Sequence, residues 1–126
     1  MNQNEKEPQE TLDFEIQFYE GIVQKNQDFV QALIALGDLY TKKGLYEKGL
    51  MIDRRLAFLK PEDPVVLYNL ACSYSLLNCL DKALATMKLA VQCGYDNFKF
   101  MKEDKDLTNL FKDSRFQEFI AQKKID

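Results

Sequence analysis

The chain has 126 residues, which suits one domain, and its 46% hydrophobic and 29% charged residues are typical of a globular protein. The net charge of −3 argues against nucleic-acid binding, because the chain has no basic excess to neutralise phosphates. The absence of histidine removes the commonest general base and the Ser-His-Asp and Cys-His catalytic arrangements.

The N-terminal part divides into a tail and a helix. Residues 1–9 are polar and contain Pro8, so we expect a flexible tail without the apolar run of a signal peptide. From there the apolar residues Leu12, Ile16 and Tyr19 recur at spacings of three and four, which predicts a leading helix over 10–26. No apolar stretch approaches the roughly 20 residues that span a bilayer. We therefore expect a soluble, cytoplasmic protein that does not bind membranes.

Four further helices follow in two pairs, over 30–63 and 64–97. Asp28 and Gln31 form a capping-box pattern at the first of these helices, and Gly44 is placed to end it. Asp63 followed by Pro64 predicts a restart, with aspartate as the N-cap and proline in the first turn. No stretch alternates apolar and polar residues over a sustained length, so we predict no strand.

The sequence repeats itself with a period of 34 residues. The shift aligns identical residues, namely Leu33 with Leu67, Leu36 with Leu70, Tyr40 with Tyr74, Lys48 with Lys82, and Leu50 with Leu84. It also aligns small residues, Gly37 with Ala71 and Gly49 with Ala83. Antiparallel helices joined by a short turn approach closely only where one side is small, so these positions predict helix-to-helix contacts.

This pattern resembles the tetratricopeptide repeat (TPR) family. The first unit has Leu33, Leu36, Gly37 and Tyr40 at the family's spacing, and the second repeats the pattern 34 residues later. The resemblance implies an all-α fold of antiparallel helix pairs, stacked as a short right-handed superhelix of about seven helices. It also implies one domain over 10–126.

Asp53 departs from the family pattern, which usually has a large apolar residue there. A carboxylate is expensive to bury without a partner. We expect either that its helix is rotated slightly, or that Asp53 lies at the edge of the helix near Arg54 or Arg55.

The repeat pattern ends near Phe98. Residues 98–126 instead contain Asp104-x-Asp106-Leu107 and then Asp113-x-Arg115-Phe116, which resembles the terminal segment of some bacterial TPR proteins. A solenoid needs terminal elements with one polar and one apolar face, so we expect capping helices here. Ser114 and Gln117 form a second capping-box pattern.

We find little in the sequence to support catalysis, so we expect a protein that is not an enzyme. The glycines are scattered singly, and the three cysteines contain no Cys-x-x-Cys pair. Asp104 and Asp106 lack the glycine and the glutamate of a calcium loop. We expect no cofactor and no metal.

The resemblance implies a peptide-binding groove on the concave face. The matching residues are Gln31, Ile34, Asp38 and Thr41 from the first unit, and Val65, Tyr68, Asn69, Cys72 and Ser75 from the second. Asn69 matches an asparagine that often holds a ligand's backbone. One branch of the family grips C-terminal carboxylates, but here only Asn69 and Lys99 fit that clamp. A second interpretation stays open, in which Ile34 and Tyr68 pack against neighbouring helices and the C-terminal helices fill the groove.

The leading expectation is a non-catalytic protein–protein interaction module that holds a peptide or a partner helix in this groove. The alternatives are a structural subunit that associates with copies of itself as a homo-oligomer, and a small export-type chaperone. In each case we expect a protein or peptide partner.

Overall fold

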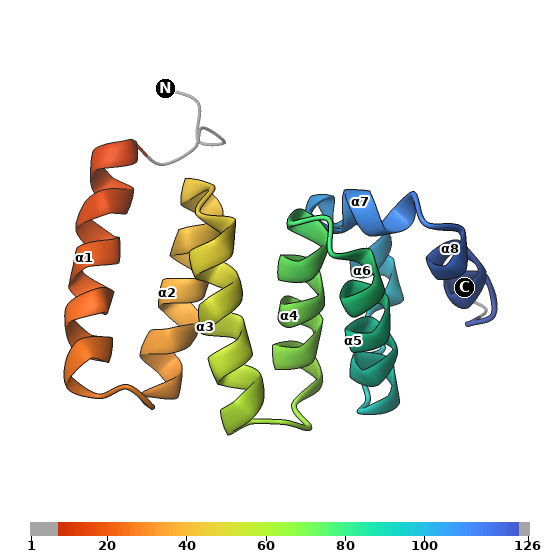
Figure 1. The fold of residues 1–126 in the computed structure, drawn as a ribbon, viewed down its shortest axis with the longest axis horizontal. Coiled ribbons are helices and arrows are strands. Elements are labelled where there is room, and N and C mark those ends of the chain that lie inside the picture. The colour runs from red at the N-terminus through yellow and green to blue at the C-terminus, as the bar shows by residue number, and fades with distance from the viewer. Residues whose placement is uncertain (1–7, 124–126) are drawn as a thin grey trace.

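The computed structural model describes residues 8–123, and every regular element in that range is helical (Figure 1). The first five helices are α1 (Gln9–Lys25), α2 (Val30–Lys43), α3 (Tyr46–Leu59), α4 (Pro64–Leu76) and α5 (Leu80–Gln92). They are followed by α6 (Phe98–Glu103), the 3-10 turn η1 (Lys105–Leu107), α7 (Thr108–Phe111) and α8 (Ser114–Ala121). The predicted all-α fold is confirmed. The predicted tail over 1–9 lies mostly outside the described residues.

Helices that follow one another in the chain pack side by side from α1 to α5 (Figure 1). The most extensive contacts join α2 to α3 and α4 to α5, so the helices form pairs. The helix α1 lies at one end of the row, and α8 lies at the other (Figure 1). This stacking is compatible with a helical repeat.

The turns inside the two pairs have the same geometry, 34 residues apart. Gly44 and Asn78 both adopt positive φ, at 84° and 60°. The amide that follows each donates to the carbonyl of the repeated tyrosine, from Leu45 to Tyr40 and from Cys79 to Tyr74, both at 2.8 Å. Asparagine tolerates this left-handed conformation better than most residues, which explains how it substitutes for glycine.

Small residues allow the paired helices to approach closely. A Cβ at Gly37 would lie 3.1 Å from both Oδ1 of Asp53 and Cγ2 of Ile52, which is tighter than ordinary packing. In the second pair, Ala71 and Ala83 are fully buried. The predicted small-residue contacts are confirmed at these positions.

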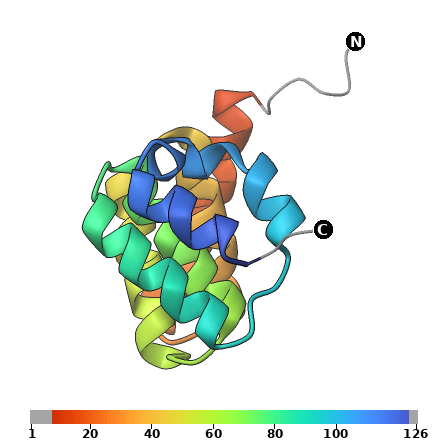
Figure 2. The same ribbon diagram turned by 90° about the vertical axis from the view of Figure 1, so that its right-hand side faces the viewer.

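The C-terminal segment after α5 covers the end of the second pair (Figure 2). Its apolar residues Met101, Leu107, Leu110 and Phe116 are completely buried in one core with residues of α4 and α5. At the other end, α1 buries Leu12 and Ile16 against α2. Its Glu20 accepts a hydrogen bond of 2.5 Å from the hydroxyl of Tyr40.

Two of the three predicted N-caps are wrong. The helix α2 has Phe29 at its N-cap, and Asp28 instead pairs with Arg55 of α3. The helix α8 is capped by Asp113, whose carboxylate accepts from the backbone amide of Arg115 at 2.8 Å, rather than by Ser114. The N-cap at Asp63 is confirmed, since its carboxylate accepts from the amides of Val65 and Val66.

Among residues 8–123, no helix combines the length and the apolar character needed to cross a membrane.

Candidate functional site

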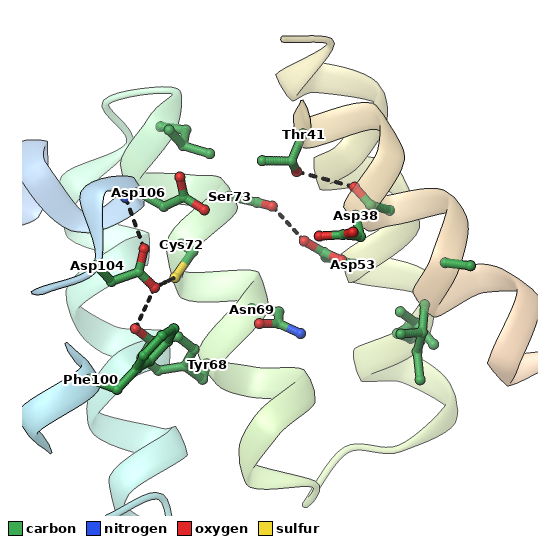
Figure 3. A pocket seen from close by; sticks show the side chains of 15 residues that line it. Asp38, Thr41, Asp53, Tyr68, Asn69, Cys72, Ser73, Phe100, Asp104 and Asp106 are labelled. Atoms are coloured by element: carbon green, nitrogen blue, oxygen red, sulfur yellow. Dashed lines mark hydrogen bonds between the residues drawn. The ribbon is translucent and has the colours of Figure 1, made fainter. Parts of the chain in front are cut away.

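A pocket of about 420 Å³ lies between α2, α4 and the segment formed by α6 and η1 (Figure 3). We call it the α2–α4 pocket. Its volume falls in the range of about 300–1,000 Å³ that is usual for ligand sites. Its lining residues are Ile34, Ala35, Gly37, Asp38, Thr41, Asp53, Leu56, Tyr68, Asn69, Cys72, Ser73, Leu76, Phe100, Asp104 and Asp106.

The α2 side of the pocket is open to solvent. Ile34 is 46% exposed, so its apolar side chain is accessible from the pocket. One turn later Asp38 is exposed and pairs with Lys42 at 3.3 Å. Thr41 donates from its hydroxyl to the carbonyl of Gly37 at 3.1 Å. Three of the four residues expected from the first unit therefore line the pocket, whereas Gln31 is exposed but does not line it.

The α4 side is covered by the C-terminal segment. Tyr68 is only 3% exposed, and its hydroxyl donates to Oδ2 of Asp104 at 2.6 Å. Its ring stacks on that of Tyr95 with centroids 4.3 Å apart, and it also contacts Phe100. For Tyr68 the packing therefore follows the second interpretation, because α6 and η1 fold back over α4 and cover its side chain.

Cys72 is buried in the same place. Its Sγ lies 3.8 Å from the Asp104 oxygen that accepts from Tyr68. Burial raises the pKa of the Cys72 thiol well above its ordinary value, and the carboxylate of Asp104 raises it further. Cys72 is therefore a neutral thiol at pH 7 rather than a nucleophilic thiolate.

Ser75 is a docking residue for the C-terminal segment, and its expected place in the groove is wrong. It is fully buried, and its Oγ accepts from the amide of Leu110 at 3.2 Å. Its carbonyl accepts from the side-chain amide of Asn109 at 3.0 Å. The two remaining expected residues are exposed, with Val65 in an adjoining hollow and Asn69 lining both that hollow and the α2–α4 pocket.

Asp53 lies in the wall of the pocket next to α2 (Figure 3). It is 8% exposed, and its Oδ2 accepts a hydrogen bond of 2.5 Å from the hydroxyl of Ser73 on α4. The expected edge position beside Arg54 or Arg55 is wrong, because Arg55 pairs with Asp28 instead. Burial raises the pKa of Asp53 to about 6, and the charge of Asp38 adds to this, while the bond from Ser73 opposes it.

The charged residues that line the pocket are acidic. Among residues 8–123, its lining includes four aspartates and neither lysine nor arginine. Asp38 and Asp53 lie on one side of it, and Asp104 and Asp106 lie on the other (Figure 3). Burial raises the pKa of Asp106, and so do the nearby charges of Asp104 and then Asp38. In the part of the chain that the structure describes, no group of three or more metal-ligating side chains is arranged to hold a metal ion.

Sequence reasoning missed five of the polar or aromatic residues of the pocket, namely Asp53, Ser73, Phe100, Asp104 and Asp106. Asp53 carried a signal, because it stands where the repeat pattern has an apolar residue. The others come to the pocket through the folding back of the C-terminal segment, or through a helix contact that joins α3 to α4.

Comparison with known proteins gives a distant relative. No known protein-family model matches the chain. The chain is 35% identical, over 86 residues, to a protein of Arabidopsis thaliana whose name describes it as chloroplastic. The aligned part covers 66% of this chain and 26% of that protein, so the match spans about a quarter of the relative's length.

Proposed function

We propose that this chain is a non-catalytic protein-interaction module of TPR type, which holds a peptide or a partner helix in the α2–α4 pocket. The observation that carries the proposal is the open α2 side of that pocket. Ile34 and Asn69 are exposed on opposite walls, and they offer an apolar contact and an amide that can bind a ligand's backbone.

The TPR assignment is supported by the repeat of sequence and the repeat of turn geometry at the same period. Lys48 lies 5.7 Å from the ring centroid of Tyr40, and Lys82 lies 5.9 Å from that of Tyr74, so even this cation–π contact recurs after 34 residues. For the compartment, the cytoplasm stays our prediction, whereas the name of the Arabidopsis relative places that protein in the chloroplast.

Self-association is a second candidate function, favoured by the outer face of α1. Phe14 is 70% exposed and Phe18 is 57% exposed, one helical turn apart. Two large apolar side chains at the end of a helical stack provide a surface on which a second copy can pack.

A paired experiment distinguishes the two functions. The purified chain is used to capture proteins from an extract of its source cells, and its mass in solution is measured by light scattering. We expect Ile34→Ala with Asn69→Ala to abolish capture while the melting temperature stays unchanged, because both side chains are exposed. Phe14→Ala with Phe18→Ala is the matched control and should retain capture.

Two results would count against the pocket. Capture that survives the Ile34 and Asn69 changes in a folded variant would place the binding site elsewhere. A dimeric mass that becomes monomeric in the Phe14 and Phe18 variant, together with no captured protein, would favour the structural subunit instead.

A further inference from the structure

We propose that the segment bound in the α2–α4 pocket carries a lysine or arginine side chain, whose cationic group lies between Asp53 and Asp106 beside apolar contacts to Ile34 and Phe100. This inference rests on the proposed function and names the chemical class of its ligand. Three features of the pocket support it: the charge of the lining, an oxygen of Asp53 that accepts no hydrogen bond from residues 8–123, and the apolar rim.

The charge of the lining is local rather than a property of the whole chain. The sequence has 17 basic and 20 acidic residues, so the two signs are nearly balanced. The part of the lining that the structure describes nevertheless has four aspartates and no basic residue. Complementary charge selects binding partners and rejects those of like charge. The pocket therefore favours a cationic ligand and repels a C-terminal carboxylate.

Asp53 is the independent observation that points to a ligand. Its side chain is more than nine-tenths buried and lines the pocket. Ser73 donates to Oδ2, whereas Oδ1 accepts no hydrogen bond from any residue in the range 8–123. Among the described residues, Oδ1 is not one of the fully buried atoms that lack a partner, so it is open to the pocket, where a charged donor of a ligand can reach it.

The other three aspartates of the pocket differ in their hydrogen-bond and ion-pair partners. Asp104 accepts from the hydroxyl of Tyr68 and from the amide of Asp106, so it is occupied in holding the C-terminal segment. Asp38 has only an exposed pair with Lys42, and pairs of this kind contribute little. Asp106 is partly buried on the side of the pocket that faces Asp38 and Asp53 (Figure 3). Asp53 and Asp106 are thus best placed to receive a cation.

The rim of the pocket provides the apolar contacts. Ile34 is 46% exposed and Phe100 is 50% exposed, and both line the pocket. Lysine and arginine bury their aliphatic stems along apolar surface while the charged group reaches polar partners. The apolar rim can contact the aliphatic stem of such a side chain, while the acidic interior receives its charged group.

The test begins with a random-peptide phage library selected on the full chain. A synthetic peptide of the dominant selected sequence is then titrated by calorimetry. We expect the selected peptides to be enriched in Lys or Arg. Replacing that residue by its neutral isostere, acetyllysine or citrulline, should weaken binding at least about tenfold, because charge-assisted hydrogen bonds are lost.

A protein-side change provides the second measurement. Asp38→Asn with Asp106→Asn should weaken binding of the basic peptide at least about tenfold. Glu47→Gln with Glu118→Gln is the matched control, because it changes the net charge equally at exposed positions away from the pocket. If the first variant does not fold, the peptide-side replacement on the unaltered chain decides the question.

The outcomes separate the inference from the proposed function. Peptides that bind without any dependence on Lys or Arg, and that are lost with Ile34→Ala and Asn69→Ala, would overturn the inference and leave the proposed function standing. Equal losses in the pocket variant and in its control would show unspecific charge attraction and would also overturn the inference. If no peptide is selected, or if binding survives every pocket variant, the proposed function falls and the inference falls with it.

Discussion

The hydroxyl of Tyr68 on α4 donates a hydrogen bond of 2.6 Å to Oδ2 of Asp104, 36 residues later in the chain. Asp104 also stands between α6 and η1, where its other oxygen accepts from the amide of Asp106 at 3.0 Å. One carboxylate therefore shapes the bend after α6 and ties that bend to α4. The contact holds the C-terminal segment over the α4 side of the expected groove, whereas the α2 side stays open.

Removing this hydroxyl should loosen the C-terminal segment. We expect Tyr68→Phe to lower the free energy of unfolding by about 1–3 kcal/mol, because the partly buried carboxylate of Asp104 loses the hydroxyl that donates to it. Urea denaturation measures the change. Tyr46→Phe, at an exposed tyrosine at the start of α3, is the control and should stay within about 0.5 kcal/mol. Equal stability of the two variants would show that the bond contributes nothing.

The buried Asp53 should make stability depend on pH. Its pKa rises from an ordinary 3.8 to about 6 on folding, so the folded state binds more protons between these values. Stability contributed by this group therefore falls as the pH rises through that window. Asp53→Asn removes the effect. We expect it to match the native chain near about pH 4 and to exceed it by about 2–3 kcal/mol at about pH 7.

The measurement is urea unfolding of both proteins at each pH. The difference between the two curves removes the titration of those carboxylates that do not interact with Asp53. A difference that does not change with pH would contradict the raised pKa of Asp53.

The close contact between α4 and α5 should not tolerate a larger side chain. Ala83 is completely buried, so Ala83→Leu should lower stability by about 1–3 kcal/mol through overpacking. Ala85, two residues later on the same helix, is exposed, and Ala85→Leu is the matched control. Thermal unfolding compares them. If both variants melt with the native chain, the assigned face of α5 is wrong.

Ser75 should matter for stability although it was expected to contact a ligand. Ser75→Ala leaves the buried amide of Leu110 without its acceptor, and we expect a loss of about 1–3 kcal/mol. Ser114→Ala changes the same side chain at an exposed position and should be nearly neutral, since Asp113 caps that helix. The melting temperatures of the two variants test both assignments. A larger loss of stability in Ser114→Ala than in Ser75→Ala would contradict this, and would indicate that Ser114 rather than Asp113 caps α8.

The sequence alone determined the helices and their pairing, because those features depend on short-range patterns. Apolar residues at spacings of three and four define one face of each helix, and Asp63 and Gly44 act within their own turns. The 34-residue repeat predicted the close helix contacts at the small residues Gly37 and Ala83, since similar sequence patterns form similar helix pairs.

Only the tertiary structure decided what covers each face. The helical period shows that Tyr68 and Ser75 share a side of α4, but it carries no information on which distant segment reaches them. The partner of Asp53 is Ser73, 20 residues away on the next helix, and not the adjacent Arg54 or Arg55. Polar side chains take their partners from the completed packing, because a buried donor or acceptor must be satisfied by whatever the fold brings within hydrogen-bond distance.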